Sequence, residues 1–304
     1  MVRTPLAVAL CIFLAGFPLV TEFQLQAQTK LSAAEIVDKN VAARGGLQAW
    51  RSVDTMTMAG KMAAGGNRRP PTTAGAPTQG KKRAPVAPPT TTTEEVQLPF
   101  LMELKRPGKV RVEIQFNGKT AIQVFDGKNG WKLRPFLGRN DVEPYTTEEA
   151  KGAALASDLD GPLIDYAAKG NKVELEAIER VEGNDCYKLK LTLKSGAVTH
   201  AWIDAKTFLE AKMEGQPKTL DGVSHPVEVY YRDYRNVNGL QIPFVLETQV
   251  QPVKTGQRQT SAQSEKTVIE KVNINPKLDD ALFTRASLEP KTAAPAAAQT
   301  AKPK

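Results

Sequence analysis

The residues of this chain most able to do chemistry are two histidines, two cysteines and scattered carboxylates. His200 and His225 could bind a metal or act as general bases, but neither has a ligand or a nucleophile at motif spacing. The sequence contains no H-E-x-x-H, no G-x-S-x-G and no phosphate-binding glycine loop. Asp204, Asp233 and Glu247 could pair across strands as general acid and base, although such residues are common on a solvated strand face. We therefore predict no catalytic residue, no metal site and no cofactor.

Cys186 is the only cysteine that remains once the N-terminal segment containing Cys11 is set aside. No internal disulfide can then form, so burial of apolar side chains has to stabilise the fold. Cys186 lies in the alternating run DCYKLKLTL, which predicts a half-buried strand position. No histidine stands near it in the sequence to lower its pKa, as a reactive thiol would require.

Three segments differ in composition from the rest of the chain. Residues 1–27 are typical of a secretory signal peptide, with a basic Arg3 and an apolar core that falls short of the ~20 residues a membrane span needs. An uncleaved membrane anchor is the weaker alternative for this segment. Residues 63–94 form a Pro/Thr/Gly-rich insertion and residues 286–304 an Ala/Pro/Lys tail, and both are predicted to be disordered. The remainder, 28–285, is predicted to be a single domain.

The net charge of +8 comes largely from the insertion and the tail. Basic residues interleaved with exposed aromatics on one surface, as nucleic-acid binding requires, are not found. We therefore predict no nucleic-acid partner.

Strand signals dominate the rest of the chain. The stretch from Val227 to Gln249 consists of two alternating runs joined by Asn238-Gly239, which is the strongest short-range signal for a β-hairpin. Similar alternating runs follow one another from Glu95 onward with short turns between them, which predicts a meander of antiparallel strands. A final strand and a short helix are predicted from the run TVIEKVNINPKLDDALF.

Two helical segments interrupt this pattern. Ser32 and Glu35 stand at capping-box spacing before an amphipathic run that ends at Gly45-Gly46. Thr146 to Lys169 has a helical composition but is broken at Gly161-Pro162, so we predict a broken helix. The fold class that follows is mainly β: an incomplete, strongly curved antiparallel barrel of about eleven strands. The N-terminal helix and the broken helix are predicted to plug its concave face.

The alternation also predicts which side chains line the concave face and its lid, and therefore which would contact an apolar ligand. The predicted ligand-binding residues are Phe100, Met102, Val112, Ile114, Phe116, Ile122, Val124, Trp131, Leu155, Leu159, Leu163, Ile164, Tyr166, Leu189, Leu191, Trp202, Val229, Tyr231, Ile242 and Phe244. The same side chains could instead form a closed core without any ligand.

Several motifs in this order resemble the outer-membrane lipoprotein-sorting proteins of the LolA-like superfamily. They are the opening helix AAEIVDKNVAARGGLQAW, the turn FDGKNGW, the segment GPLIDYAAKGNKVELEAIERVEGNDCYKLKLTLKSG, the strand pair IDAKTFLEAKM and the hairpin DYRNVNGLQIPF. The resemblance spans about Leu31 to Phe283, and the insertion interrupts it. The motifs taken together and in this order are specific, whereas each motif alone is a weak signal.

The resemblance implies a periplasmic half-barrel with a helical lid, here Leu155 through Tyr166. Such a protein carries acyl chains of lipoproteins or other lipids through water. Partners implied in this way are the lipid or lipoprotein acyl chains and donor and acceptor proteins of the inner and outer membranes. Two alternatives stay open at this point: a ligand-free scaffold or interaction protein of the envelope, and an unrecognised hydrolase.

Overall fold

The computed structural model describes residues 31–64, 96–220, 222–255, 258–259 and 263–289. The chain is divided between Leu31 and Ser32, and every described element belongs to the second part, Ser32–Lys304. The predicted signal peptide lies outside the described residues, as do most of the predicted insertion and most of the predicted tail.

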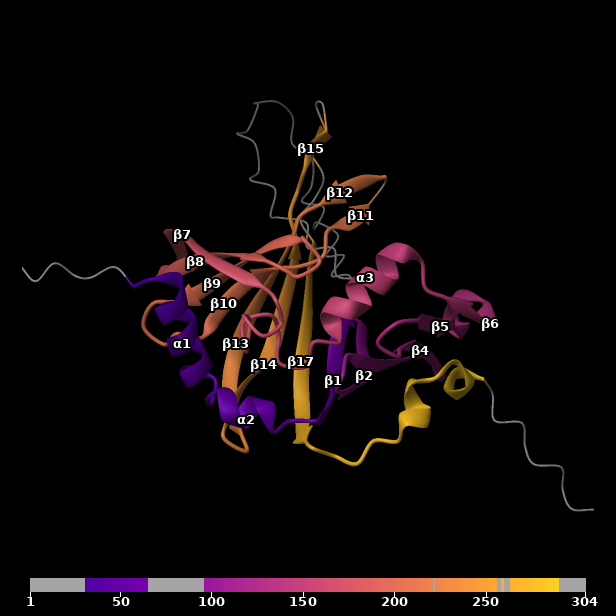
Figure 1. The fold of residues 1–304 in the computed structure, drawn as a ribbon. Helices are drawn as coiled ribbons and strands as arrows, with labels where there is room; N and C mark the ends of the chain where they lie inside the picture. Colours follow the sequence, from indigo (N-terminus) through magenta and orange to yellow (C-terminus); the bar gives the residue numbers. More distant parts are fainter. Residues whose placement is uncertain (1–30, 65–95, 221, 256–257, 260–262, 290–304) are drawn as a thin grey trace, which may run out of the picture. The chain divides into compact units, whose positions relative to one another are not determined.

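Among the described residues strands predominate, together with three α-helices and three short 3-10 helices (Figure 1). The helices are α1 (Ala33–Ala43), α2 (Leu47–Arg51), η1 (Pro135–Leu137), α3 (Thr147–Ala156), η2 (Asp280–Phe283) and η3 (Arg285–Leu288). The strands are β1 (Thr55–Ala64), β2 (Val96–Lys105), β3 (Lys109–Phe116), β4 (Lys119–Phe125), β5 (Gly130–Arg134), β6 (Arg139–Pro144), β7 (Lys172–Val181), β8 (Asn184–Thr192), β9 (Val198–Asp204), β10 (Glu210–Glu214), β11 (Lys218–Leu220), β12 (Val223–His225), β13 (Val227–Val237), β14 (Leu240–Val250), β15 (Lys254–Thr255), β16 (Arg258–Gln259) and β17 (Gln263–Ile274).

One antiparallel sheet of 13 strands organises the fold, in the order β6-β5-β4-β3-β2-β1-β17-β14-β13-β10-β9-β8-β7. It consists of two meanders, β1 to β6 and β7 to β14, and the last strand of the chain, β17, lies between them. Strands β6 and β7 are the two ends of the sheet, so it is not closed into a barrel. This confirms the predicted class of an incomplete antiparallel barrel.

The two faces of the sheet carry separate apolar clusters. We call the inner face the one that bears Phe100, Phe125 and Phe244, because these side chains pack with Trp50 of α2 and with Ile164 of the segment after α3 in the main core cluster. The other, outer face is covered at β4 and β5 by the C-terminal segment. There Phe283 and Leu288 pack against Val124.

The predicted hairpin is confirmed as β13 and β14, with Val237 paired to Leu240 and positive φ angles at Asn238 (51°) and Gly239 (88°). The predicted number of strands was too low. β6 was not predicted, because its sequence RNDVEP shows no apolar alternation, and β11, β12, β15 and β16 are too short to give a pattern.

Both predicted capping boxes are present. The Ser32 side chain accepts from the N–H of Glu35 at the start of α1, and Thr146 accepts from the N–H of Glu149 at the start of α3. The prediction of a two-piece broken helix was wrong in its second half. The chain leaves α3 after Ala156, and the stretch Leu159–Gly170 is a series of turns, because Gly161 and Asp165 have positive φ angles that interrupt a helix.

Two predicted boundaries were also wrong. Ala63 is buried and belongs to β1, so the sheet extends into the predicted insertion. Arg285–Leu288 forms η3, and Leu288 is buried against the outer face, so the predicted disordered tail begins too early. Arg111, itself buried, fastens this segment to the outer face by donating to the Leu282 carbonyl and to the Ser287 hydroxyl.

Candidate ligand-binding site

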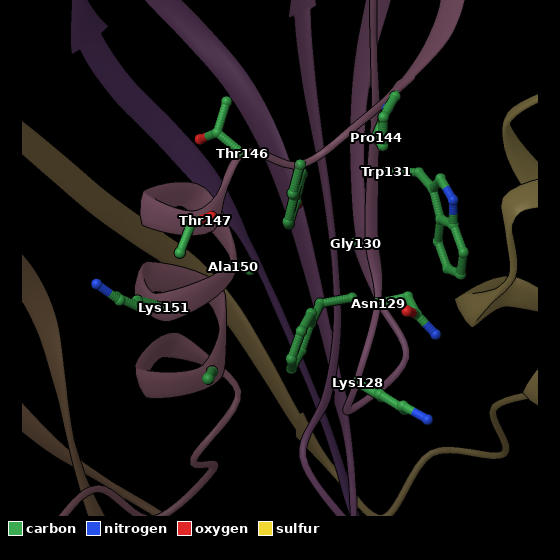
Figure 2. Close-up of a pocket in the computed structure, with 12 residues that line it drawn as sticks. Lys128, Asn129, Gly130, Trp131, Pro144, Thr146, Thr147, Ala150 and Lys151 are labelled. Carbon is green, nitrogen blue, oxygen red and sulfur yellow. The ribbon is translucent and has the colours of Figure 1, made fainter. Parts of the chain in front are cut away.

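A groove runs along α3, between this helix and the turns at one end of the first meander. It comprises two adjoining pockets of about 590 Å³ and 510 Å³ that share Phe125, Lys128 and Ala154 among their lining residues. The first pocket lies between α3 and β5, and its helical wall includes Thr147, Ala150 and Lys151 (Figure 2). A volume of this size is in the range of small-molecule sites.

The floor of this groove is set by a close approach of Tyr145 to Gly130. A Cβ atom at Gly130 would lie 1.9 Å from Cδ2 of Tyr145, so only glycine leaves room for the ring. The Tyr145 N–H also donates to the Gly130 carbonyl at 2.9 Å. Burial raises the pKa of Tyr145 to about 12, and the charge of Glu149 adds to this, so its hydroxyl stays protonated.

Helix α3 rests on the sheet through polar contacts more than through apolar ones. None of its side chains is fully buried, and Ala153 is its only residue among those packed against the main core cluster. Its first turn is held by Glu149, which pairs with the buried Lys132 of β5. A helix attached in this way is easier to displace than one that buries an apolar stripe.

The segment that follows α3, residues 157–170, fills the inner face. We call it the lid segment. Leu159 and Ile164 belong to the main core cluster, where they pack with side chains of the sheet and of α2. Leu163 is also buried, with 1% of its surface exposed. The lid segment is therefore part of the apolar core on the inner face.

A cluster of ionised side chains fixes the lid segment at its base. Nζ of Lys169 lies 2.7 Å from Asp158 and 2.6 Å from Asp160, and Arg106 donates to the other oxygen of Asp160 at 2.6 Å. Arg44, at the end of α1, donates to the Asp160 backbone carbonyl at 3.0 Å and pairs with Glu210 at 3.1 Å.

The two carboxylates of this cluster differ in pKa. Burial raises the pKa of Asp158 to about 6, and the Lys169 charge offsets only part of this. Burial also acts on Asp160, but hydrogen bonds from Lys169 and Arg106 outweigh it and lower the pKa of Asp160.

The structure brings many of the predicted ligand-binding residues together on the inner face. Those in the main core cluster are Phe100, Leu159, Ile164, Ile242 and Phe244, with Met102, Val112 and Ile114 packed against them. Leu163, Leu189 and Leu191 are buried, and Phe116, Tyr166, Val229 and Tyr231 are half-buried. Leu155 is 41% exposed and so contributes little to the lid.

Three predicted residues lie on the outer face instead. Val124 is buried against Phe283 and Leu288, with Ile122 and Trp131 packed around them. The ring of Trp131 points away from α3 (Figure 2). These predictions were wrong because β4 is apolar on both faces, and alternation alone cannot tell which face is inner.

Trp202 was also placed wrongly. It pairs with Lys188 and Lys212, opposite to the face of Leu189. Its indole N–H donates to Glu179 at 2.8 Å, and Nζ of Lys212 lies 4.2 Å from a ring centroid. Trp202 is therefore part of a charged and aromatic outer surface rather than of the inner face.

The histidines and the cysteine lie apart from the groove. His200 bonds to Glu214 at 2.8 Å and lies 3.2 Å from Glu176, while His225 is fully buried and contacts the Gln251 carbonyl at 2.9 Å. Cys186 is buried, and burial raises its pKa to about 11. Among the described residues, no group of three or more His, Cys, Asp or Glu side chains is arranged to hold a metal ion.

Sequence reasoning missed the groove itself. Lys128, Tyr145, Ala150 and Ala154 line it, and none of them was predicted as a site residue. Asp126-Gly127-Lys128-Asn129-Gly130 did predict the turn, but nothing in the sequence shows that this turn meets α3. Of the helices that the structure describes, none has the length and apolar character needed to cross a bilayer.

No protein-family model matches the chain, and no curated protein matches it in sequence. Among the solved structures that share its fold are the following three. A LolA superfamily protein from Nitrosomonas europaea has a TM-score of 0.50 at 13% identity and covers 84% of this chain and 99% of its own. A Vibrio parahaemolyticus domain described as an outer-membrane lipoprotein-sorting protein has a TM-score of 0.51 at 12% identity and covers 84% of this chain and 97% of its own.

The third is a DUF1329 family protein from Desulfovibrio piger, with a TM-score of 0.50 at 13% identity, covering 84% of this chain and 99% of its own. At these identities the likeness concerns the fold, which agrees with the 13-strand open sheet and its inner-face helices. The chain therefore has the LolA-like fold.

Proposed function

We propose that this protein is a periplasmic carrier that binds a hydrophobic ligand on the inner face of its sheet and transfers it within the cell envelope. The ligand class is an acyl chain, either of a lipoprotein or of another lipid. One observation carries the proposal: Leu159 and Ile164 of the lid segment fill the inner face, and they are fixed there by a separate ionic cluster at the base of the segment.

The mechanism is an exchange of buried contacts. Helix α3 has no fully buried side chain, so lifting it with the lid segment exposes mainly Leu159, Leu163 and Ile164. An acyl chain that takes their place is stabilised by ~0.8 kcal/mol for each CH₂ group that it buries. A ligand of this kind can therefore hold the open form, and a partner that binds it better can remove it.

The periplasmic location and the partners belong to the same proposal. The LolA-like fold and the signal peptide predicted for residues 1–27 support export, although the signal segment lies outside the described residues. Donor and acceptor proteins of the inner and outer membranes are the partners that a transfer function requires. The proposal assigns no catalytic role to the protein, and the described histidines and Cys186 lie away from the groove.

Organic extraction of protein purified from its native periplasm, followed by mass spectrometry, tests the proposal. The expected result is a lipid in near-stoichiometric amount, together with saturable binding of a fluorescent fatty acid. Recovery of no lipid and no probe binding would contradict the carrier function and favour a ligand-free scaffold.

A variant of the lid segment gives a sharper test. Ile164→Ala removes a side chain that competes with the ligand, so probe affinity should rise while the free energy of unfolding falls by ~2–5 kcal/mol. Leu288→Ala is the control, because Leu288 is similarly buried but packs on the outer face, away from the proposed ligand. Equal changes in probe affinity for the two variants would show that the lid segment does not compete with ligand.

A further inference from the structure

Lys128 differs from the other cations around the groove beside α3. Lys151 pairs with Glu148 at 3.0 Å, and Lys109 pairs with Asp280 at 2.7 Å. In the part of the chain that the structure describes, the Lys128 ammonium has no ion pair and no hydrogen bond, although Lys128 lines both pockets of the groove. Lys128 is exposed and its side chain points away from α3 (Figure 2), so rotation of its flexible stem, with no contact to break, brings the ammonium to a ligand in the groove.

The turn that carries Lys128 is fixed in place. Oδ1 of Asp126 accepts from the N–H of Lys128 at 2.8 Å and from the N–H of Asn129 at 2.6 Å. This carboxylate is therefore engaged by its own turn. The position of the Lys128 backbone at the rim is set by the fold rather than by a ligand.

The groove combines this free cation with an apolar floor. Phe125, with 4% of its surface exposed, belongs to the main core cluster, and Tyr145 packs against the same cluster. Ala150 and Ala154 provide a wall of small side chains on α3. The floor is therefore continuous with the inner face, where the lid segment lies.

We infer that the groove beside α3 binds an amphiphile with one acyl chain and an anionic head, with the head at Lys128 and the chain along Phe125 and Tyr145 toward the inner face. The charges support an anion: Lys109 and Lys151 are paired, whereas Lys128 has no partner among the described residues, and the one carboxylate that lines the pockets, that of Asp126, is engaged by its own turn. The inference rests on the proposed carrier function, and it adds the charge of the ligand and the place where it enters.

Binding of two probes with the same chain tests it: palmitate, which is anionic at pH 8, and hexadecanol, which is neutral. Lys128→Gln should weaken palmitate binding about 1.5- to fivefold, the range of one exposed ion pair, and leave hexadecanol binding unchanged. Raising the salt concentration should weaken palmitate binding to the unmodified protein more than to the variant.

Lys206→Gln is the matched control. Lys206 is an exposed lysine two residues after an aspartate, Asp204, that accepts from its N–H at 3.0 Å, as Asp126 does for Lys128. Loss of palmitate affinity in this control to the same extent would show a general effect of charge and overturn the inference.

The path of the chain is tested on α3. Ala154→Trp should weaken both probes by filling the groove, whereas Ala156→Trp, on the same helix but outside the groove, should not. Displacement of palmitate by inorganic phosphate or acetate alone would point to a small-anion site and overturn the proposed occupant.

The outcomes separate the two proposals. If neither probe binds the unmodified protein, the carrier function fails. If both probes bind, and equally well with and without Lys128, the carrier function stands and the inference about an anionic head is wrong.

Discussion

At the scale of single residues, the base of the lid segment concentrates charge in a buried place. Asp160 is 3% exposed and receives hydrogen bonds from Lys169 and Arg106, while Asp158 shares Lys169 with it. Two carboxylates on one ammonium cannot both be equally well compensated. The fold disfavours the ionised form of Asp158, because the cost of desolvating this carboxylate is larger than the stabilisation that it gains from Lys169.

This arrangement predicts a pH dependence. Because the pKa of Asp158 rises to about 6, the folded protein binds this proton more tightly than the unfolded chain. The resulting stabilisation is fully present below about pH 4 and is lost as the pH rises through 6. Urea unfolding from pH 4 to 7 should therefore show the unmodified protein losing about 2 kcal/mol relative to Asp158→Asn.

Asp165→Asn is the control for removing one negative charge from the same segment, since Asp165 pairs with the exposed Arg51. The Asp160 carboxylate affects stability in a different pH range. Because its pKa is lowered, it stabilises the fold at neutral pH, and this stabilisation is lost only when the pH falls below the ordinary pKa of an aspartate. A constant difference between the unmodified protein and Asp158→Asn across pH 4 to 7 would contradict the assignment.

At the scale of elements, two glycines, one in α3 and one in strand β5 beneath it, have opposite effects on stability. Gly130 of β5 leaves the space that the Tyr145 ring fills. Gly152 lies in α3, and an added Cβ there would meet nothing within 4 Å. The first glycine is required by packing, whereas the second only lowers the helix propensity of α3.

Substitution of each glycine by alanine should therefore change stability in opposite directions. Gly152→Ala should raise the free energy of unfolding by up to about 1 kcal/mol, because alanine is the better helix former. Gly130→Ala should lower it by about 1–3 kcal/mol, because the Tyr145 ring has to move. Urea denaturation measures both, and a stabilising Gly130→Ala would show that the ring is not held against β5.

At the scale of the whole sheet, β17 joins two meanders that make no other strand pairing with each other in the described sheet. Its contact with β1 includes a register shift between Ala59 and Gly60. A Cβ at Gly60 would lie 2.0 Å from the backbone carbonyl oxygen of Val268. Backbone cannot give way as a flexible side chain can, so this position determines how closely the two halves approach.

Gly60→Ala should thus destabilise the protein by at least about 2 kcal/mol. Gly152→Ala carries the same chemical change at an open position and serves as the control. Urea unfolding of both variants gives the comparison. An unchanged unfolding free energy for Gly60→Ala would mean that β1 and β17 tolerate a wider separation than the structure has.

Local features of this fold could be predicted from the sequence, because their cause is local. Asn238-Gly239 predicted the β13–β14 hairpin since both residues adopt positive φ, and Ser32 with Glu35 predicted the start of α1. The short turns between neighbouring strands are also local signals, and they predicted the meanders. The position of β17 between the meanders depends on pairing across the chain and has no local signal.

The site could be predicted only in part. Phe100, Ile242 and Phe244 were placed together correctly because each strand they occupy is apolar on one face. Ile122 and Val124 were not, because η2 and η3 cover the outer face of β4 and make it apolar too. Lys128 was missed because only the three-dimensional arrangement shows that its turn borders the groove beside α3.

The central place of β17 also governs how this chain can fold. Met56 of β1 pairs with Ile274 of β17, so the middle of the sheet forms only when distant parts of the chain meet. Such non-local pairing is slow compared with the closing of the hairpins within each meander. Until β17 is available, β1 and β14 each present an unpaired strand edge, which is the kind of surface that associates with other chains. Aggregation during folding should therefore begin at the centre of the finished sheet rather than at its ends.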